Sequence, residues 1–148
     1  MVEASGVVVA LTDDGPEGDR YRARFGDEEL AVPELMDLEV ASALRQLVTR
    51  GDLDVSRARR ALADLAAMTV KRFSHVPLLD RIWELRENVT PYDAAYVALA
   101  EDLGATLVTA DARLRRAPGP RCAIEVLVYH DPTGPGAREP NADSEERR

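Results

Sequence analysis

Short apolar segments rich in β-forming residues alternate along this chain with longer segments of helical spacing. When a helix connects two neighbouring strands of one sheet, the strands run parallel and the helix packs on a face of the sheet. The alternation therefore predicts an α/β fold, a three-layer α/β/α sandwich with a mainly parallel central sheet. In sheets of this kind, sites form at the carboxyl ends of the strands.

The helix expected over residues 91–103 has the clearest boundaries. Thr90 is a good N-cap residue, Pro91 suits the first helical position, and Gly104 follows the last turn. The apolar run at 106–109 is typical of a buried strand. The pattern thus predicts a helix that leads directly into the sheet.

The other elements follow from the same rules. Strands are expected at residues 1–5, 30–32, 69–73 and 124–128, and helices at 33–50, 57–68 and 78–87. Pro33 would open the first of these helices, Gly51 would end it, and Ser56 would cap the second. Two segments stay open: residues 7–11 favour a strand but permit a buried helical turn, and residues 13–18 form a loop or lead into a helix.

Length and composition define a single domain. A chain of 148 residues supports one hydrophobic core, and from His130 onward almost nothing is apolar, so we expect a domain over 1–129 and a disordered tail over 130–148. The longest apolar stretch, 7–11, is too short to cross a bilayer and follows no charged leader, which predicts a cytoplasmic protein. The single cysteine, Cys122, excludes an internal disulfide and a cysteine-only zinc site.

The net charge of −8 bears on the kind of partner. A protein that grips long duplexes by neutralising phosphates is normally basic. Either nucleic acid is not a partner, or it is met locally through bound cations and a few arginines. Arg113, Arg115 and Arg116 could hold RNA phosphates or could form an ordinary solvated edge.

Acidic residues occupy positions where the predicted topology would bring them together. They are Glu3 after the first strand, Glu39 in the helix after the second, Asp93 in a first helical turn, and Asp111 just beyond the strand at 106–109. Ionised carboxylates in one crevice repel one another, and a divalent cation relieves the repulsion. Mg²⁺ or Mn²⁺ prefers such oxygen ligands and can activate water beside a phosphate.

Each acid also has a purely structural interpretation. Asp93 with Thr90 resembles a capping box, and Asp111 could cap a short helix. Glu39 could pair with Arg45, and Asp37 on the same helix competes with it for a place in the cluster. Glu3 near a terminus would usually be a solvated charge.

Four stretches together are similar to the VapC toxins of the PIN-domain family. They read VEAS at 2–5, PELMDLEVASAL at 33–44, TPYDAAYVALA at 90–100 and LVTADARL at 107–114. The resemblance covers residues 1–128. It favours Glu39 over Asp37 and assigns residues 7–11 to the first helix.

The resemblance implies Mg²⁺-dependent RNA cleavage, dimerisation, and inhibition by a cognate VapB-type antitoxin. It also implies a toxin of a type II toxin–antitoxin system, with Mn²⁺ as an alternative metal. Glu3, Asp93 and Asp111 would hold the metal, and Glu39 would complete the catalytic cluster. Ser5 and Thr109 would orient carboxylates from behind.

One position departs from the family pattern. Glu3 stands where the family carries aspartate, and one extra methylene moves a carboxylate by more than an ångström, which Mg²⁺ tolerates badly. A second hypothesis is therefore a catalytically silent PIN domain that acts by binding its antitoxin or a second copy. A receiver-like signalling domain is disfavoured, since the only lysine, Lys71, lies mid-chain.

Overall fold

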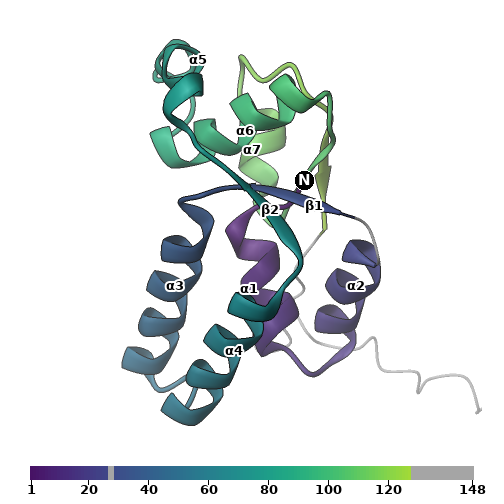
Figure 1. Cartoon of the computed structure of the whole chain (residues 1–148), viewed down its shortest axis with the longest axis vertical. Coiled ribbons are helices and arrows are strands. Elements are labelled where there is room, and N and C mark those ends of the chain that lie inside the picture. The colour runs from purple at the N-terminus through teal and green to yellow at the C-terminus, as the bar shows by residue number, and fades with distance from the viewer. Residues whose placement is uncertain (27–28, 128–148) are drawn as a thin grey trace, which may run out of the picture.

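The computed structural model describes residues 1–26 and 29–127, and its elements form three layers (Figure 1). The strands are β1 (Leu30–Pro33), β2 (Val70–Phe73), β3 (Leu107–Thr109) and β4 (Ile124–Val126). Helices α1 (Ala4–Thr12), α2 (Pro16–Phe25), α3 (Met36–Arg50) and α4 (Val55–Ala67) lie on one side of β1 and β2, and α5 (Leu79–Glu84) and α6 (Pro91–Leu103) on the other. The predicted α/β class is confirmed. The predicted tail at 130–148 and the domain end at 129 lie outside the described residues.

The strand pairings in the described part of the chain are parallel. β1 pairs with β2 and β3 pairs with β4, so the sheet is divided into two two-stranded parts. Val2 forms a parallel bridge with Val108, where the Glu3 N–H donates to the Val108 carbonyl at 2.9 Å. The strand predicted over residues 1–5 is therefore reduced to this bridge, because α1 begins at Ala4.

Helix α6 runs through the core. Residues 94–100 are all buried, and the helix packs against α5, β1 and β3. Thr90 caps it by accepting the Asp93 N–H at 3.2 Å, and Gly104 ends it at φ 59°. Its predicted boundaries are confirmed, and they place Asp93 in the turn where the helix enters the core.

Residues 7–11 lie in α1, despite their β-branched side chains. Val7 and Ala10 are buried where α1 packs against α2 and α3, and this packing outweighs the local preference for strand. Of the alternatives for residues 13–18, the structure shows a loop leading into α2. A Cβ on Gly18 would lie 1.8 Å from the Asp13 carbonyl oxygen, so the close approach of α2 to this loop requires glycine.

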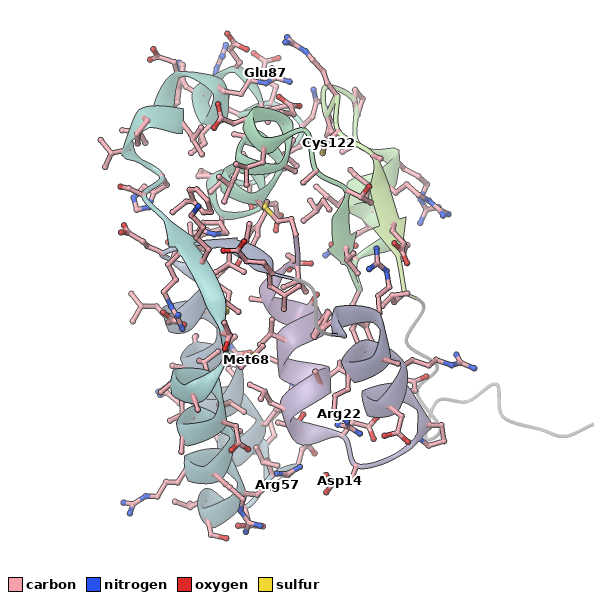
Figure 2. The ribbon with its side chains drawn as sticks, turned by 45° about the vertical axis from the view of Figure 1, so that its right-hand side comes forward. Asp14, Arg22, Arg57, Met68, Glu87 and Cys122 are labelled. Atoms are coloured by element: carbon pink, nitrogen blue, oxygen red, sulfur yellow. The ribbon has the colours of Figure 1, made fainter. Side chains whose placement is uncertain are left out.

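An ion pair and a hydrogen bond connect α4 and α2 to the loop between α1 and α2. Arg57 on α4 meets Asp14 at 2.7 Å, and Arg22 on α2 donates to the Asp13 carbonyl at 2.8 Å. Figure 2 shows Asp14, Arg22 and Arg57 gathered around the loop between α1 and α2. The contacts hold one end of the helical layer together.

Several predicted boundaries are wrong. Pro33 ends β1 rather than opening a helix, because the Glu34 N–H still donates to Phe73 of β2 at 2.9 Å. Asp54, not Ser56, caps α4: its charged carboxylate is the stronger acceptor and takes the Arg57 N–H at 2.9 Å. The helix predicted over 78–87 is a short 3₁₀ turn, η1 (Val76–Leu78), followed by α5.

Gly51 ends α3 at φ 81°, as predicted. Across residues 1–26 and 29–127, no helix combines the length and apolar character that a bilayer crossing requires.

Candidate functional site

Glu3 lies at the amino-terminal end of α1, beside the end of β3. Its Oε2 accepts the Ser5 hydroxyl at 2.8 Å and also the Thr109 hydroxyl. Thr109 is fully buried, so its hydroxyl is held in place by the core. Glu3 is thus a half-buried carboxylate with two hydroxyl donors rather than a freely solvated charge.

Asp111 is joined to Glu3 through Thr109. Its backbone N–H donates to Thr109 Oγ1 at 2.9 Å, so one hydroxyl connects the two acids. The Asp111 carboxylate also caps α7 (Ala112–Arg116) by accepting the Arg113 N–H at 2.8 Å. The alternative interpretation of Asp111 as the cap of a short helix is therefore confirmed, and it is compatible with a place in the acidic cluster.

The guanidinium of Arg113 binds the same carboxylate. Its Nε and Nη2 donate to Asp111 at 2.8 to 3.1 Å and hold the pKa of Asp111 below its ordinary value. The charge of Arg116 contributes to the same shift. Arg115 is exposed and makes no hydrogen bond or ion pair with these acids within the described residues. Of the three arginines, Arg113 alone thus contacts a candidate site residue.

Asp93 occupies the first turn of α6. Thr90 Oγ1 donates to Asp93 Oδ2 at 2.8 Å while accepting the Asp93 N–H. In a capping box the acid would reach the N-cap backbone N–H. Here it takes the hydroxyl instead, so Asp93 has one hydroxyl donor, as Glu3 has two.

Glu39 lies on α3 and accepts the Tyr96 hydroxyl of α6 at 2.6 Å on Oε2. Burial raises the pKa of Glu39; the Tyr96 hydrogen bond opposes this rise, and the charges of Glu3 and Asp93 add to it. These charges show that the three acids share one electrostatic environment. Glu39 makes no pair with Arg45, in contrast to the structural alternative.

Asp37, the competing acid, faces elsewhere. Its carboxylate binds Arg72 of β2 through two hydrogen bonds, at 2.6 and 2.9 Å. An acid so paired is already neutralised, which leaves Glu39 as the α3 acid beside Glu3 and Asp93.

The donor chemistry of this cluster suits a hard divalent cation. Glu3, Glu39 and Asp93 offer carboxylate oxygens, and their hydrogen-bond donors are hydroxyls rather than cations. In residues 1–26 and 29–127, however, no three acidic, histidine or cysteine side chains lie together as a ready ligand set. The residues fit a metal in type and electrostatics, and their side chains are spread apart.

Tyr96 is the residue at this site that sequence reasoning missed. A signal existed: it is a tyrosine within a helical stretch otherwise built from Ala, Val and Leu. A buried phenol needs a hydrogen-bond partner, so a tyrosine in such a stretch indicates a polar group on the neighbouring element.

Comparisons with known proteins agree with this fold. Residues 2–120 match the family model of the PIN domain. The solved structure of PAE2754 from Pyrobaculum aerophilum superposes with a TM-score of 0.62 at 27% identity, covering 84% of this chain and 81% of that one. The fold is that of a PIN-domain protein.

Relatives narrow the class. VapC ribonuclease Mb0985 of Mycobacterium bovis is 44% identical over 127 residues, which are 86% of this chain and 97% of the relative. Ribonuclease VapC1 of Mycobacterium tuberculosis is 40% identical over 128 residues, 86% of this chain and 96% of the relative. The chain belongs to the VapC ribonucleases of the PIN-domain family.

Proposed function

We propose that this chain hydrolyses phosphodiester bonds in RNA as the toxin of a type II toxin–antitoxin system, with Glu3, Glu39, Asp93 and Asp111 as its catalytic acids. The observation that carries the proposal is the shared environment of Glu3, Glu39 and Asp93. They come from distant segments, the charges of Glu3 and Asp93 raise the pKa of Glu39, and the hydrogen-bond donors of all three are hydroxyl groups. Placing three acids in one electrostatic environment, with no arginine of the described residues hydrogen-bonded to any of them, lowers stability, which is typical of a functional site.

Glu3, Asp93 and Asp111 would hold Mg²⁺, with Mn²⁺ as an alternative. When bound, such an ion supplies a nucleophilic water at neutral pH and stabilises charge on the phosphate. Ser5 and Thr109 fix Glu3 by donating to one of its oxygens. Thr109 also fixes the backbone of Asp111, so one buried side chain orients two acids.

Arg113 serves this function by exchanging partners. Its side chain is 88% exposed while it binds Asp111, so it can leave the carboxylate at little cost. Once released, it can bind an RNA phosphate beside the acids, and Arg115 and Arg116 extend the same positive edge. RNA is thus met locally by arginines although the net charge is −8.

A catalytically silent PIN module is the second candidate. It is favoured by the glutamate at position 3 and by the absence, in the described residues, of a ready ligand set. Calorimetric titration with Mg²⁺ separates the two. A silent module binds little metal and gains nothing from Glu3→Asp, whereas an active site binds the ion.

We also propose that the chain binds a cognate VapB-type antitoxin and a second copy of itself, and that it acts in the cytoplasm. Support for the second copy comes from exposed apolar residues: Val76, Leu79 and Trp83 are 62%, 52% and 68% exposed and follow helical spacing. Sedimentation tests this part: Trp83→Glu should convert a dimer into a monomer, and a wild-type chain that sediments as a monomer contradicts it.

The direct test is RNA cleavage in Mg²⁺ and in Mn²⁺ by the wild type and by Asp93→Asn. Asparagine keeps the shape of the side chain and removes its charge, so the helix should still form. Cleavage by the wild type alone supports the proposal; equal cleavage by both proteins refutes the assignment.

A further inference from the structure

Tyr96 joins two distant parts of the acidic cluster from inside the core. Its side chain is fully buried, and its hydroxyl donates to Glu39 Oε2 at 2.6 Å. The Ala4 backbone N–H, directly after Glu3, lies close enough to the same hydroxyl to act on the pKa of Tyr96, which it tends to lower. One phenol oxygen therefore lies between the first turn of α1 and the Glu39 carboxylate on α3.

The hydroxyl is not needed for packing. Phenylalanine would fill the same space in α6 without bringing a polar atom into the core. Burying a hydroxyl is unfavourable unless it finds a partner, and Glu39 is the acceptor it finds. The identity of this residue is thus explained by the carboxylate and not by the core.

A tyrosine also orients an acid without neutralising it. Burial raises the pKa of Tyr96 far above its ordinary value, and the carboxylate of Glu39 raises it further. The phenol therefore stays a neutral donor at all physiological pH values. An arginine in its place would cancel the negative charge that a metal site requires.

We propose that Tyr96 is a positioning residue for RNA cleavage. Its hydroxyl holds Glu39 by Oε2 beside the first turn of α1 and leaves the other carboxylate oxygen, Oε1, free to accept a hydrogen bond. Among the described residues, no group donates a hydrogen bond to Oε1. This inference rests on the proposed function, since it assigns Tyr96 a part in the same site.

The test is Tyr96→Phe, with Tyr21→Phe as a matched control. Tyr21 is also buried, and its hydroxyl donates to the Leu127 carbonyl at 2.8 Å, so the control removes the same atom from a bond that involves no acid. Tyr96→Phe should lower kcat by about tenfold or more and leave KM for RNA within about twofold, since orientation and not binding is lost. Tyr21→Phe should leave both unchanged.

A double-mutant cycle shows whether Tyr96 acts through Glu39. In a Glu39→Gln background, Tyr96→Phe should change the residual rate by less than about twofold. The double variant also lacks the carboxylate that Tyr96→Phe leaves without its donor, and so provides a folded protein if the single variant is unstable.

A measurement without RNA keeps the two proposals separable. In metal-free protein, carboxyl-carbon NMR should show a higher pKa for Glu39 in Tyr96→Phe than in the wild type, because the lost hydrogen bond had lowered it. If the wild type cleaves no RNA, the proposed function fails while this comparison still tests the contact. An unchanged rate, an unchanged pKa of Glu39, or full additivity in the cycle each overturns the role of Tyr96.

Discussion

Two partly buried glutamates have opposite surroundings: Glu101 near the carboxyl end of α6, and Glu39 of α3, which lies beside the amino-terminal half of α6. At the carboxyl end, Glu101 accepts two hydrogen bonds from Arg81, at 2.7 and 3.1 Å, and the Arg121 N–H at 2.7 Å. Burial acts to raise the pKa of Glu101, but these donors bring it below its ordinary value. Beside the amino end, burial raises the pKa of Glu39; the single hydroxyl of Tyr96 opposes this rise without cancelling it, and the charges of Glu3 and Asp93 add to the rise.

We take this difference to separate a structural glutamate, Glu101 of α6, from a proposed functional one, Glu39 of α3. Glu101 ties α6 to α5, because its partner Arg81 lies on α5. Arg81 also binds Glu84 at 2.8 Å and the Gly119 carbonyl at 2.8 Å. Its charge is neutralised, so it stabilises the fold. Among the described residues, Glu3, Glu39 and Asp93 at the other end accept hydrogen bonds from hydroxyls and not from cations, an arrangement that lowers stability and leaves their oxygens available to bind a cation.

Metal removal should give the largest effect, a loss of RNA cleavage that depends on the acids at the amino end of α6 and not on Glu101. A chelator should reduce RNA cleavage by at least about a hundredfold, because water activation and charge stabilisation depend on the ion. After chelation, the melting temperature of the RNA-free protein should equal that of protein kept without metal throughout, because the fold does not depend on the ion. Gel-based cleavage with and without chelator, followed by added Mg²⁺ or Mn²⁺, checks this. Cleavage that persists in chelator contradicts a metal-dependent site.

The carboxyl end should carry the larger effect on folding. Arg81→Met leaves Glu101 without its cation in a partly buried place and should lower the free energy of unfolding by about 2–3 kcal/mol. Arg86→Met is the control: Arg86 and Glu87 are exposed, and the loss should stay below about 0.5 kcal/mol. Chemical denaturation measures both, and equal losses would show that the Arg81 cluster is not structural.

Stability should depend on pH with opposite signs at the two ends. The pKa of Glu39 is raised above its ordinary 4.5, so its contribution to stability is present at low pH and lost as pH rises through the folded value. The pKa of Glu101 is lowered from 4.5, so its contribution is present above that value and lost as pH falls.

Matched glutamine variants test this sign difference in metal-free protein. Above pH 4.5, Glu39→Gln should become more stable than the wild type, while Glu101→Gln should be less stable by about 1–2 kcal/mol. The deficit of Glu101→Gln should shrink as pH falls. Denaturation curves across the pH range decide the matter, and parallel profiles for the two variants would refute the comparison.

The smallest effect is expected at Arg113. This arginine neutralises Asp111, as Arg81 neutralises Glu101, but its side chain is 88% exposed against 20% for Arg81. Arg113→Ala should therefore leave stability within about 0.5 kcal/mol of the wild type. Mn²⁺ affinity should rise a few-fold, since Asp111 no longer exchanges a cation for the metal. Calorimetry measures the affinity; a weaker affinity shows that Arg113 helps to build the site.

Local signals in the sequence predicted much of the fold. Thr90, Pro91 and Gly104 defined both ends of α6, because capping and φ preferences act over a few residues. The start of α2 stayed open, since its Pro, Gly and charged residues are typical of loops and its helix depends on packing of Tyr21 and Phe25. The extent of β1 depended on pairing with β2, which no local pattern contains.

The candidate site was predictable as residue types and not as contacts. Topology placed Glu3, Glu39 and Asp93 at one end of the fold, and the choice between Glu39 and Asp37 came from the family resemblance. The structure adds that Asp37 is occupied by Arg72 and that Tyr96 holds Glu39. Such pairs join residues 35 and 57 positions apart, so they follow from tertiary packing alone.

The central claim is that the acids at the amino end of α6 perform the chemistry while Glu101 at the other end maintains the fold. Single-turnover cleavage of RNA in Mg²⁺ by Glu39→Gln and Glu101→Gln tests it most directly, since each variant loses one charge and almost no volume. We predict that Glu101→Gln cleaves at the wild-type rate at a temperature where it is folded, and that Glu39→Gln is slower by about a hundredfold or more. Cleavage by Glu39→Gln at the wild-type rate would contradict the claim.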